Sequence, residues 1–116
     1  MNVRIYEYAK CSTCRNALKF LQARKIQFKA VPIVDQPPTV TELKSMMGYV
    51  GLKRMFNTSG VQYRELGIAE KLKTMAENEA LTLLSKNGKL IKRPFVLLKN
   101  GGLVGFKEDE WKAAFK

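Results

Sequence analysis

The sequence of 116 residues contains no histidine, only two cysteines and no long apolar run. Without histidine there can be no Cys/His nucleophile pair and no His-ligated metal, and two thiols are too few for a structural zinc site. No stretch approaches the roughly 20 consecutive apolar residues of a membrane-spanning helix, and the first residues, MNVRIY, lack the apolar run of a signal peptide. We therefore expect a cytoplasmic protein with no metal site and no membrane association.

The scarcity of cysteine also excludes a disulfide-stabilised scaffold. Small secreted domains need several well-separated bridges, whereas Cys11 and Cys14 are three positions apart. A bridge between them would close almost no loop and would stabilise the fold little. This spacing favours a chemical role for the two thiols over a structural one.

Acidic residues are few, with 10 Asp and Glu against 21 Lys and Arg, so the formal net charge is +11. Such a charge favours acidic partners, among them nucleic acid, acidic protein surfaces, glutathione and oxyanions. The bases are spread from Arg4 to Lys116 without a long run, and few aromatics are interleaved with them. We therefore expect a solvated basic surface rather than direct, specific nucleic-acid binding.

Length and composition indicate one globular domain over residues 1–116, which we expect to be monomeric. Residues 3–8 alternate between apolar and polar types, which predicts a strand. Helical spacing of apolar residues follows from Cys14 to about Lys25, and a second alternating segment lies before Pro32. The chain therefore opens with a strand, a helix and a strand, and both cysteines lie at the first strand-to-helix turn.

A helical region of about residues 38–86 is predicted next. Thr39 and Glu42 form a capping box ahead of a short helix, and residues 69–84 carry helical spacing. The last third of the sequence predicts a strand over residues 95–98 and a tight turn over 100–102. A hairpin partner strand over 103–106 and a final helix from residue 108 onward follow.

The position of Cys11 favours a reactive thiol, because the unpaired N–H groups and dipole of a helix N-terminus stabilise a thiolate. Cys14 lies one turn further on the same face and could resolve a mixed disulfide on Cys11. Lys10 and Arg15 flank the motif and would lower the thiol pKa further if their charges lie close to the sulfur. The alternative, a chance pair of small buried residues, is less favoured in this context.

Four segments resemble one known group of proteins over nearly the whole chain: CSTCRNALKFL, FNTSGVQYRELGI, KRPFVLL and GFKEDEW. In this order they are similar to the arsenate reductase-like/Spx/MgsR family. The resemblance implies an α/β thioredoxin-like fold, a mixed four-stranded sheet with a helical insert between strands 2 and 3. It further implies that Cys11 is the redox residue, that Arg15 lies beside it, and that Arg93 faces it before a cis Pro94.

The position of the two cysteines and the bases around them favour a thiol-disulfide redox protein of this family with no bound cofactor. Cys14 or glutathione would resolve it, and glutathione, glutaredoxin or thioredoxin would reduce it. One alternative is an Spx-like redox-switched regulator that binds the C-terminal domain of the RNA polymerase α subunit. Another is a glutaredoxin-dependent arsenate reductase. The arginine triad of those reductases is matched plainly only by Arg93, because Asn57 and Lys107 stand at the other two positions.

These considerations give two groups of candidate site residues. The catalytic candidates are Cys11, Cys14, Arg15 and Arg93. The substrate-binding candidates are Lys10, Thr13, Asn57, Pro94 and Lys107.

Overall fold

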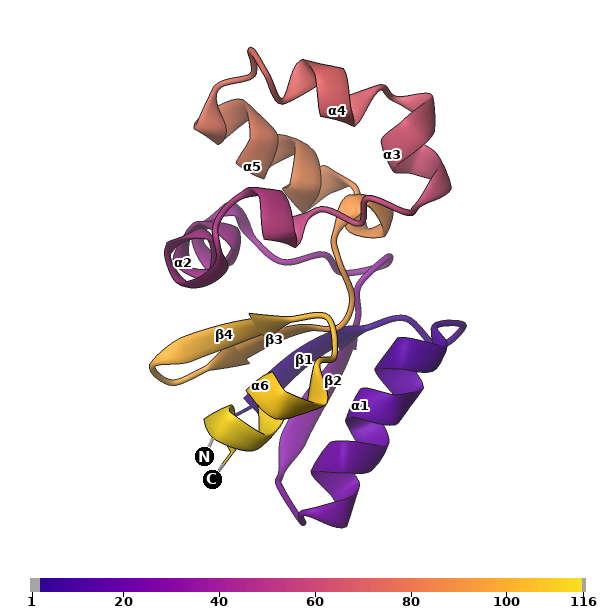
Figure 1. Ribbon diagram of the computed structural model, residues 1–116, viewed down its shortest axis with the longest axis vertical. Helices are drawn as coiled ribbons and strands as arrows, with labels where there is room; N and C mark the ends of the chain where they lie inside the picture. The colour runs from indigo at the N-terminus through magenta and orange to yellow at the C-terminus, as the bar shows by residue number, and fades with distance from the viewer. Residues whose placement is uncertain (1–2, 116) are drawn as a thin grey trace.

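A four-stranded mixed sheet forms the centre of the computed structural model, which describes residues 3–115 (Figure 1). Its strands lie in the order β2-β1-β3-β4. β1 runs parallel to β2, whereas β1 with β3 and β3 with β4 are antiparallel. The strand bounds are Val3–Glu7 for β1, Phe28–Pro32 for β2, Phe95–Leu98 for β3 and Gly101–Val104 for β4.

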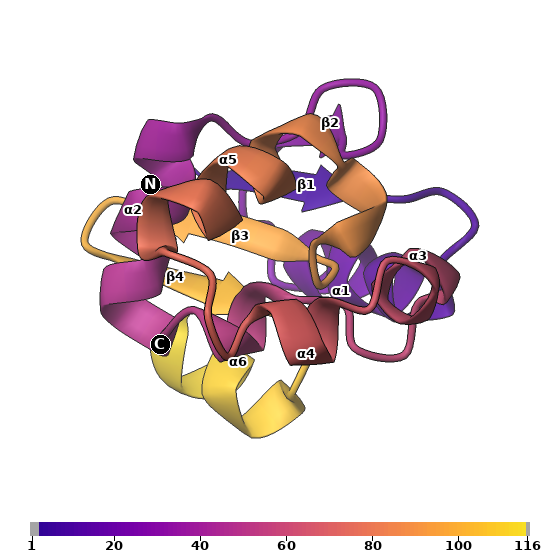
Figure 2. The same cartoon turned by 90° about the horizontal axis from the view of Figure 1, so that it is seen from above.

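Helices cover both faces of the sheet. On one face lie α1 (Ser12–Ala23) and α6 (Glu108–Ala114), and on the other lie the helices between β2 and β3 (Figures 1 and 2). These are α2 (Val40–Val50), α3 (Val61–Glu65), α4 (Ile68–Lys71) and α5 (Glu77–Lys86), with 3-10 turns η1 (Lys53–Met55) and η2 (Gly88–Leu90). The arrangement is the predicted thioredoxin-like fold with a helical insert between strands 2 and 3.

Alternation along the strands supplies apolar side chains to both faces. Ile5 and Val96 pack with α1 and α6, whereas Tyr6 and Phe95 pack with the inserted helices. Successive strand residues point to opposite faces, so a central strand covered on both sides is apolar throughout. This explains the continuous apolar run of β3.

Two predicted elements differ from the structure. The helix expected over residues 69–84 is two helices, α4 and α5, and the chain bends between them. Ile68 and Leu84 are both fully buried in one core cluster, yet in a single straight helix they would stand about 24 Å apart along the axis. The bend therefore allows both ends of the segment to pack into the same core.

The second difference concerns the β3–β4 hairpin. Gly101 and Gly102 were expected in the turn, but they belong to β4 and pair with Leu98 and Leu97. A Cβ atom at Gly102 would collide with the Met46 sulfur of α2. The glycine is therefore explained by the close approach of α2 to this strand rather than by turn geometry.

Among the helices of residues 3–115, none has the length and apolar character needed to cross a membrane.

Candidate functional site

The turn between β1 and α1 presents the first cysteine at the open end of a helix. Cys11 is the N-cap of α1, in extended conformation, and its N–H donates to the carbonyl of Tyr8 over 2.9 Å. The backbone N–H of Cys14 donates to the Cys11 Sγ over 3.4 Å. The sulfur therefore occupies the position in which a side-chain acceptor satisfies an unpaired helix N–H group.

The environment of Cys11 favours its thiolate. Partial burial opposes ionisation, but hydrogen bonds from Cys14 and the positive charge of Arg93 outweigh it and lower the pKa of the Cys11 thiol. The side chain is half-buried, so it remains accessible from one side. Accessibility and a lowered pKa together are the properties of a nucleophilic cysteine.

The second cysteine has the opposite environment. Cys14 is completely buried on the inner side of α1, and both thiols are free. Burial raises the pKa of Cys14 to about 12, and the neighbouring Cys11 sulfur contributes to the increase. Cys14 is therefore a protonated, shielded thiol next to an accessible one.

Arg93 and Pro94 approach the thiols from the start of β3. The Arg93–Pro94 peptide bond is cis, as predicted. The Arg93 guanidinium lies over the Tyr8 ring, with its central carbon 4.7 Å from the ring centroid. Pro94 is buried, and its carbonyl accepts the N–H of Gly105 over 2.8 Å. Pro94 thus connects the start of β3 to the segment that leaves β4.

Arg15 and Lys10 are less involved than the sequence suggested. Both are exposed, and the Arg15 Nη1 donates to the carbonyl of Ala9 over 3.0 Å. Neither residue lines the cleft beside Cys11. The positive charge that lowers the pKa of the Cys11 thiol is that of Arg93. Arg15 instead braces the turn that carries Cys11.

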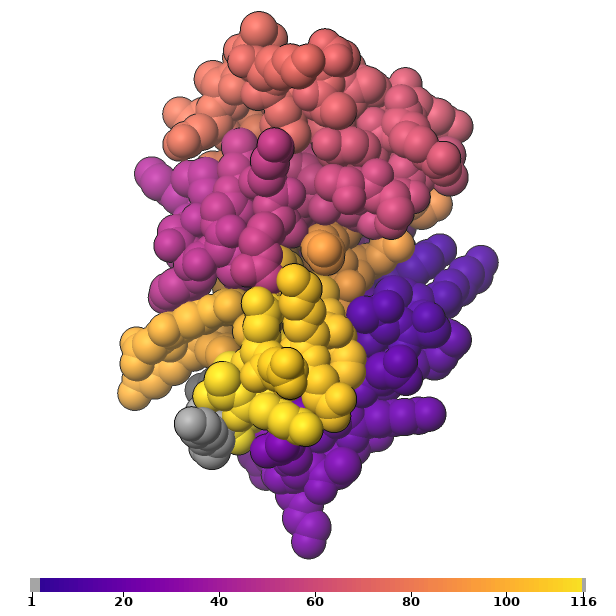
Figure 3. Space-filling view, in the orientation of Figure 1, coloured from indigo at the N-terminus to yellow at the C-terminus, as the bar shows by residue number. Residues whose placement is uncertain are grey.

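A cleft of about 600 Å³ opens beside Cys11 where four segments of the chain meet. In the space-filling view the C-terminal segment lies between the inserted helices and α1 (Figure 3). The wall of the cleft includes five of the predicted site residues: Cys11, Thr13, Asn57, Arg93 and Lys107. Seven lining residues were not among the candidates: Ser59, Gly60, Val61, Lys92, Val104, Gly105 and Phe106.

Asn57 uses both of its polar side-chain atoms in contacts within the protein, one in its own loop and one to η2. The amide nitrogen donates to the carbonyl of Lys89 over 3.4 Å, and the amide oxygen accepts from the Ser59 hydroxyl over 3.4 Å. A Cβ atom at Gly60 would lie 2.7 Å from the Asn57 amide nitrogen, so glycine leaves room for this arrangement. Asn57 therefore shapes the wall of the cleft and brings no charge to it.

The cleft is cationic and contains no metal-ligand cluster. Its charged lining residues are Lys92, Arg93 and Lys107, and no carboxylate is among the lining residues of this cleft. Across residues 3–115 no group of three or more Cys, Asp or Glu side chains is placed to hold a metal ion. The arrangement can therefore bind an anion close to a thiolate.

Residues 6–114 match the model of the ArsC family. The chain belongs to the ArsC family. A relative in Bacillus subtilis, named YusI, is 45% identical, and the alignment covers 97% of each chain. The regulatory protein MgsR of Bacillus subtilis is 27% identical over 90% of this chain and 83% of MgsR. The global transcriptional regulator Spx 2 of Bacillus cereus is 29% identical over 93% of this chain and 82% of the regulator.

Solved structures of the ArsC family share the fold. An ArsC-family-related protein from Bacteroides fragilis superposes with a TM-score of 0.86 at 45% identity and 97% coverage of each chain. A structure from Streptococcus mutans, described as a possible arsenate reductase, has a TM-score of 0.86 at 35% identity, covering 95% of this chain and 97% of that one. The family and fold implied by the four sequence segments are thereby confirmed.

Proposed function

We propose that this ArsC-family protein is a thiol-disulfide redox protein in which Cys11 is the attacking thiolate and Cys14 is the resolving thiol. The observation that supports it is the pairing of an accessible N-cap cysteine of lowered pKa with a buried cysteine of pKa about 12. A nucleophile must be ionised and reachable, whereas a resolving thiol needs protection until its partner has reacted. The two cysteines meet these separate requirements.

In the first step the Cys11 thiolate attacks one sulfur of a substrate disulfide. A new S–S bond forms between Cys11 and that sulfur, the substrate S–S bond breaks, and the other half leaves as a thiolate. Arg93, whose charge already favours the Cys11 thiolate, is placed to stabilise negative charge on the leaving group. Protein and substrate are then joined as a mixed disulfide.

In the second step Cys14 loses its proton to water and attacks the Cys11 sulfur. The mixed disulfide breaks, the second substrate thiolate leaves, and a Cys11–Cys14 bridge remains. The Cys11 sulfur is one of the groups that raise the pKa of Cys14. Once Cys11 is in a disulfide it carries no negative charge, so its effect on Cys14 is relieved and the second step follows the first.

Mass spectrometry of two cysteine variants tests this sequence of steps. After mild oxidation with oxidised glutathione, the wild type should contain an intramolecular bridge, Cys14→Ser should accumulate a mixed disulfide on Cys11, and Cys11→Ser should trap nothing. If the wild type accumulates glutathione on Cys11 while Cys14 stays free, the resolving thiol is glutathione. If no variant reacts at Cys11, the proposal is wrong. Addition of glutathione with glutaredoxin, or of thioredoxin, then identifies the reductant.

A second candidate function is a redox-switched regulator, favoured by the relatives named MgsR and Spx. In this role the Cys11–Cys14 bridge would change the affinity for the C-terminal domain of the RNA polymerase α subunit, and the protein would act in the cytoplasm. A pull-down with purified RNA polymerase, under reducing and oxidising conditions, tests it. Capture in one redox state supports the regulator, and no capture in either state excludes it.

A further inference from the structure

The cleft beside Cys11 holds more positive charge than activation of the thiol requires. Arg93 is the basic side chain whose charge lowers the pKa of the Cys11 thiol. Lys92 and Lys107 also line the cleft, and within residues 3–115 neither forms an ion pair. Both lysines are exposed, and in a cleft without carboxylates they add positive charge where a substrate of Cys11 would lie.

Lys92 is held in position by contacts on both its backbone and its side chain. Its N–H donates to the Met55 carbonyl over 2.8 Å, next to the bridge between Phe56 and Ile91. Its Cε lies 3.0 Å from where a Cβ atom on Gly105 would stand, so the aliphatic chain passes directly over that glycine. Lys92 is exposed overall, so its aliphatic chain lies against the cleft wall while its ammonium group is open to solvent and to a ligand in the cleft.

Gly105 is itself fixed from two directions. Its N–H donates to the Pro94 carbonyl over 2.8 Å, and its carbonyl accepts from the Trp111 indole over 3.1 Å. Its φ of +72° favours glycine, and any side chain there would displace Lys92. Lys107, two residues further on, is the N-cap residue of α6 and lines the same cleft. Hydrogen bonds therefore fix the backbone of Gly105, which lies beneath Lys92 and two residues before Lys107.

We propose that Lys92 and Lys107 select anionic disulfides, small disulfides with carboxylates close to the sulfur atoms, as the oxidising substrates of Cys11. This inference rests on the proposed thiol-disulfide function and specifies its substrate class. Lysine presents a compact point charge without the fixed fork of arginine, which suits carboxylates in varied positions better than one rigid oxyanion. The cations attract such a substrate and also stabilise the anionic thiolate that leaves it.

The reaction remains the exchange described above, with the anionic disulfide as oxidant. Cys11 Sγ bonds to one substrate sulfur while the substrate S–S bond breaks, and one carboxylate-bearing thiolate leaves. Attack by Cys14 releases the second thiolate and leaves the protein oxidised. Two electrons pass from the Cys11 thiolate and the Cys14 thiol to the disulfide, and the proton of Cys14 is released to water.

Two chromogenic disulfides of different charge test the proposal: dithiobis(nitrobenzoate), which carries two carboxylates, and dithiodipyridine, which is neutral at pH 7. The second-order rate constants are measured by stopped flow in the Cys14→Ser background, so that only the first exchange is seen. Lys92→Gln and Lys107→Gln should each lower the ratio of the anionic rate to the neutral rate by about threefold to tenfold, as expected for loss of one nearby charge. Lys92→Arg should keep the ratio.

The ratio separates substrate selection from thiol activation, because a change in the pKa of Cys11 alters both rates together. Lys44→Gln, an exposed lysine of α2 outside the cleft, is the matched control for net charge and should leave the ratio unchanged. The proposal is overturned if Lys92→Gln and Lys107→Gln lower both rates equally, or if Lys44→Gln lowers the ratio as much. If neither probe reacts at Cys11 of the parent protein, the thiol-disulfide function itself fails.

Discussion

The two faces of the sheet are packed in different ways. On the face of α1 and α6, the rings of Phe20, Phe106, Trp111 and Phe115 contact one another with centroid distances from 4.9 to 6.1 Å. On the face of the inserted helices the aromatic contacts are separate pairs, such as Tyr6 with Phe95, among aliphatic and methionine side chains. Large flat rings with few rotatable bonds hold their neighbours more firmly than methionine does.

The two faces of the sheet also contribute differently to the cleft beside Cys11. The aromatic cluster holds α1, which carries both cysteines, and α6, whose Trp111 fixes Gly105 beneath Lys92. The inserted helices supply the opposite wall of the cleft through Asn57 and Val61, and Val61 is 59% exposed. The thiols are therefore positioned from the aromatic face, while the insert contributes the wall that faces them across the cleft.

The largest effect expected on the aromatic face is the contrast in reactivity of its two thiols. Because the pKa of the Cys11 thiol is lowered and burial raises the pKa of Cys14 to about 12, a far larger fraction of Cys11 than of Cys14 is thiolate at pH 7. Brief treatment of the reduced protein with iodoacetamide should label Cys11 alone, as read from fragment ions of the tryptic peptide CSTCR. A rate that rises with pH through a midpoint at or above the unperturbed thiol value of about 8.5 would contradict an activated Cys11.

Next in size is the loss of stability on removing the central ring of the aromatic cluster. Trp111→Ala should lower the free energy of unfolding by about 3–5 kcal/mol, since a fully buried indole with several ring contacts leaves a large cavity. On the other face, Met46→Leu should cost less than about 1.5 kcal/mol, because volume is kept and the surroundings adapt. Urea unfolding measures both. Equal losses at Trp111 and Met46 would remove the distinction between the faces.

Sequence reasoning succeeded where local signals decide the structure. The alternation in β1, the helical spacing after Cys11 and the Thr39 capping box all describe interactions between residues close in the chain. The arrangement of the sheet and insert came from resemblance of four segments to a known family rather than from periodicity. Strand order and the position of the insert depend on contacts between residues far apart in the chain, which local sequence patterns indicate only weakly.

The failures have a common physical origin in tertiary contacts. Nothing local marks the bend between α4 and α5, because it serves to bring Ile68 into the same core as Leu84. α3 buries none of its five residues and so carries no apolar period. Lys92 adjoins Arg93 in sequence, yet only its passage over Gly105 shows that it lines the cleft. Its place at the start of the KRPFVLL segment, next to Arg93, was the signal available in the sequence.

The wall supplied by the insert predicts poor arsenate reduction. Asn57 is uncharged and bonded to Lys89 and Ser59, and lysines lack the planar fork that holds an oxyanion bidentately. With glutathione and glutaredoxin as reductants, we expect arsenate turnover to be at least about tenfold slower than disulfide reduction, a modest difference in barrier. A coupled assay that follows NADPH consumption measures both. Comparable turnover would show that the cleft accepts oxyanions despite Asn57.

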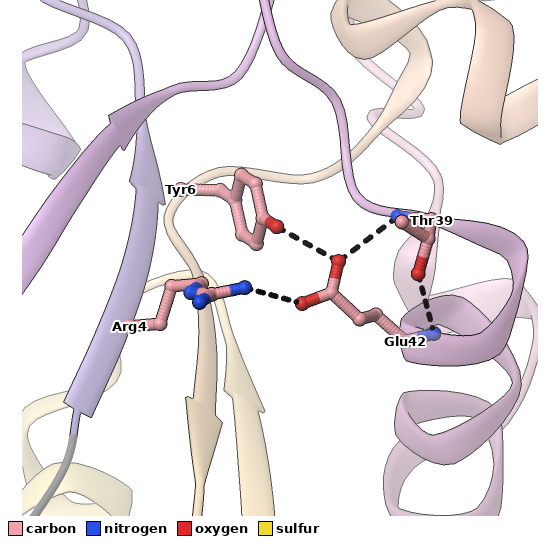
Figure 4. Close-up of polar contacts among 4 residues, drawn as sticks. All are labelled: Arg4, Tyr6, Thr39 and Glu42. Atoms are coloured by element: carbon pink, nitrogen blue, oxygen red, sulfur yellow. Dashed lines mark hydrogen bonds and ion pairs between the residues drawn. The ribbon is translucent and has the colours of Figure 1, made fainter.

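The smallest effect on stability is expected at Glu42, near the start of α2, whose side chain connects the inserted helices to the sheet. Its carboxylate accepts from the Arg4 guanidinium over 3.1 Å, from the Tyr6 hydroxyl over 2.8 Å and from the Thr39 N–H over 3.0 Å (Figure 4). Against the effect of partial burial, the hydrogen bonds from Thr39 and Tyr6 and the charge of Arg4 lower the pKa of Glu42 below 4.5. The folded protein therefore favours the ionised form.

Glu42→Gln tests this connection because glutamine keeps the size of the side chain and removes its charge. The stabilisation from a lowered carboxyl pKa is present at neutral pH and is lost as pH falls from about 4.5 through the lowered value. The variant should lose about 1 kcal/mol at pH 7, a small amount because Arg4 is half-exposed. It should approach the wild type in acid, where both side chains are neutral. Urea unfolding at pH 7 and pH 3 measures the difference, with exposed Glu65→Gln as the control, and a loss equal at both pH values would show that shape, not charge, ties α2 to the sheet.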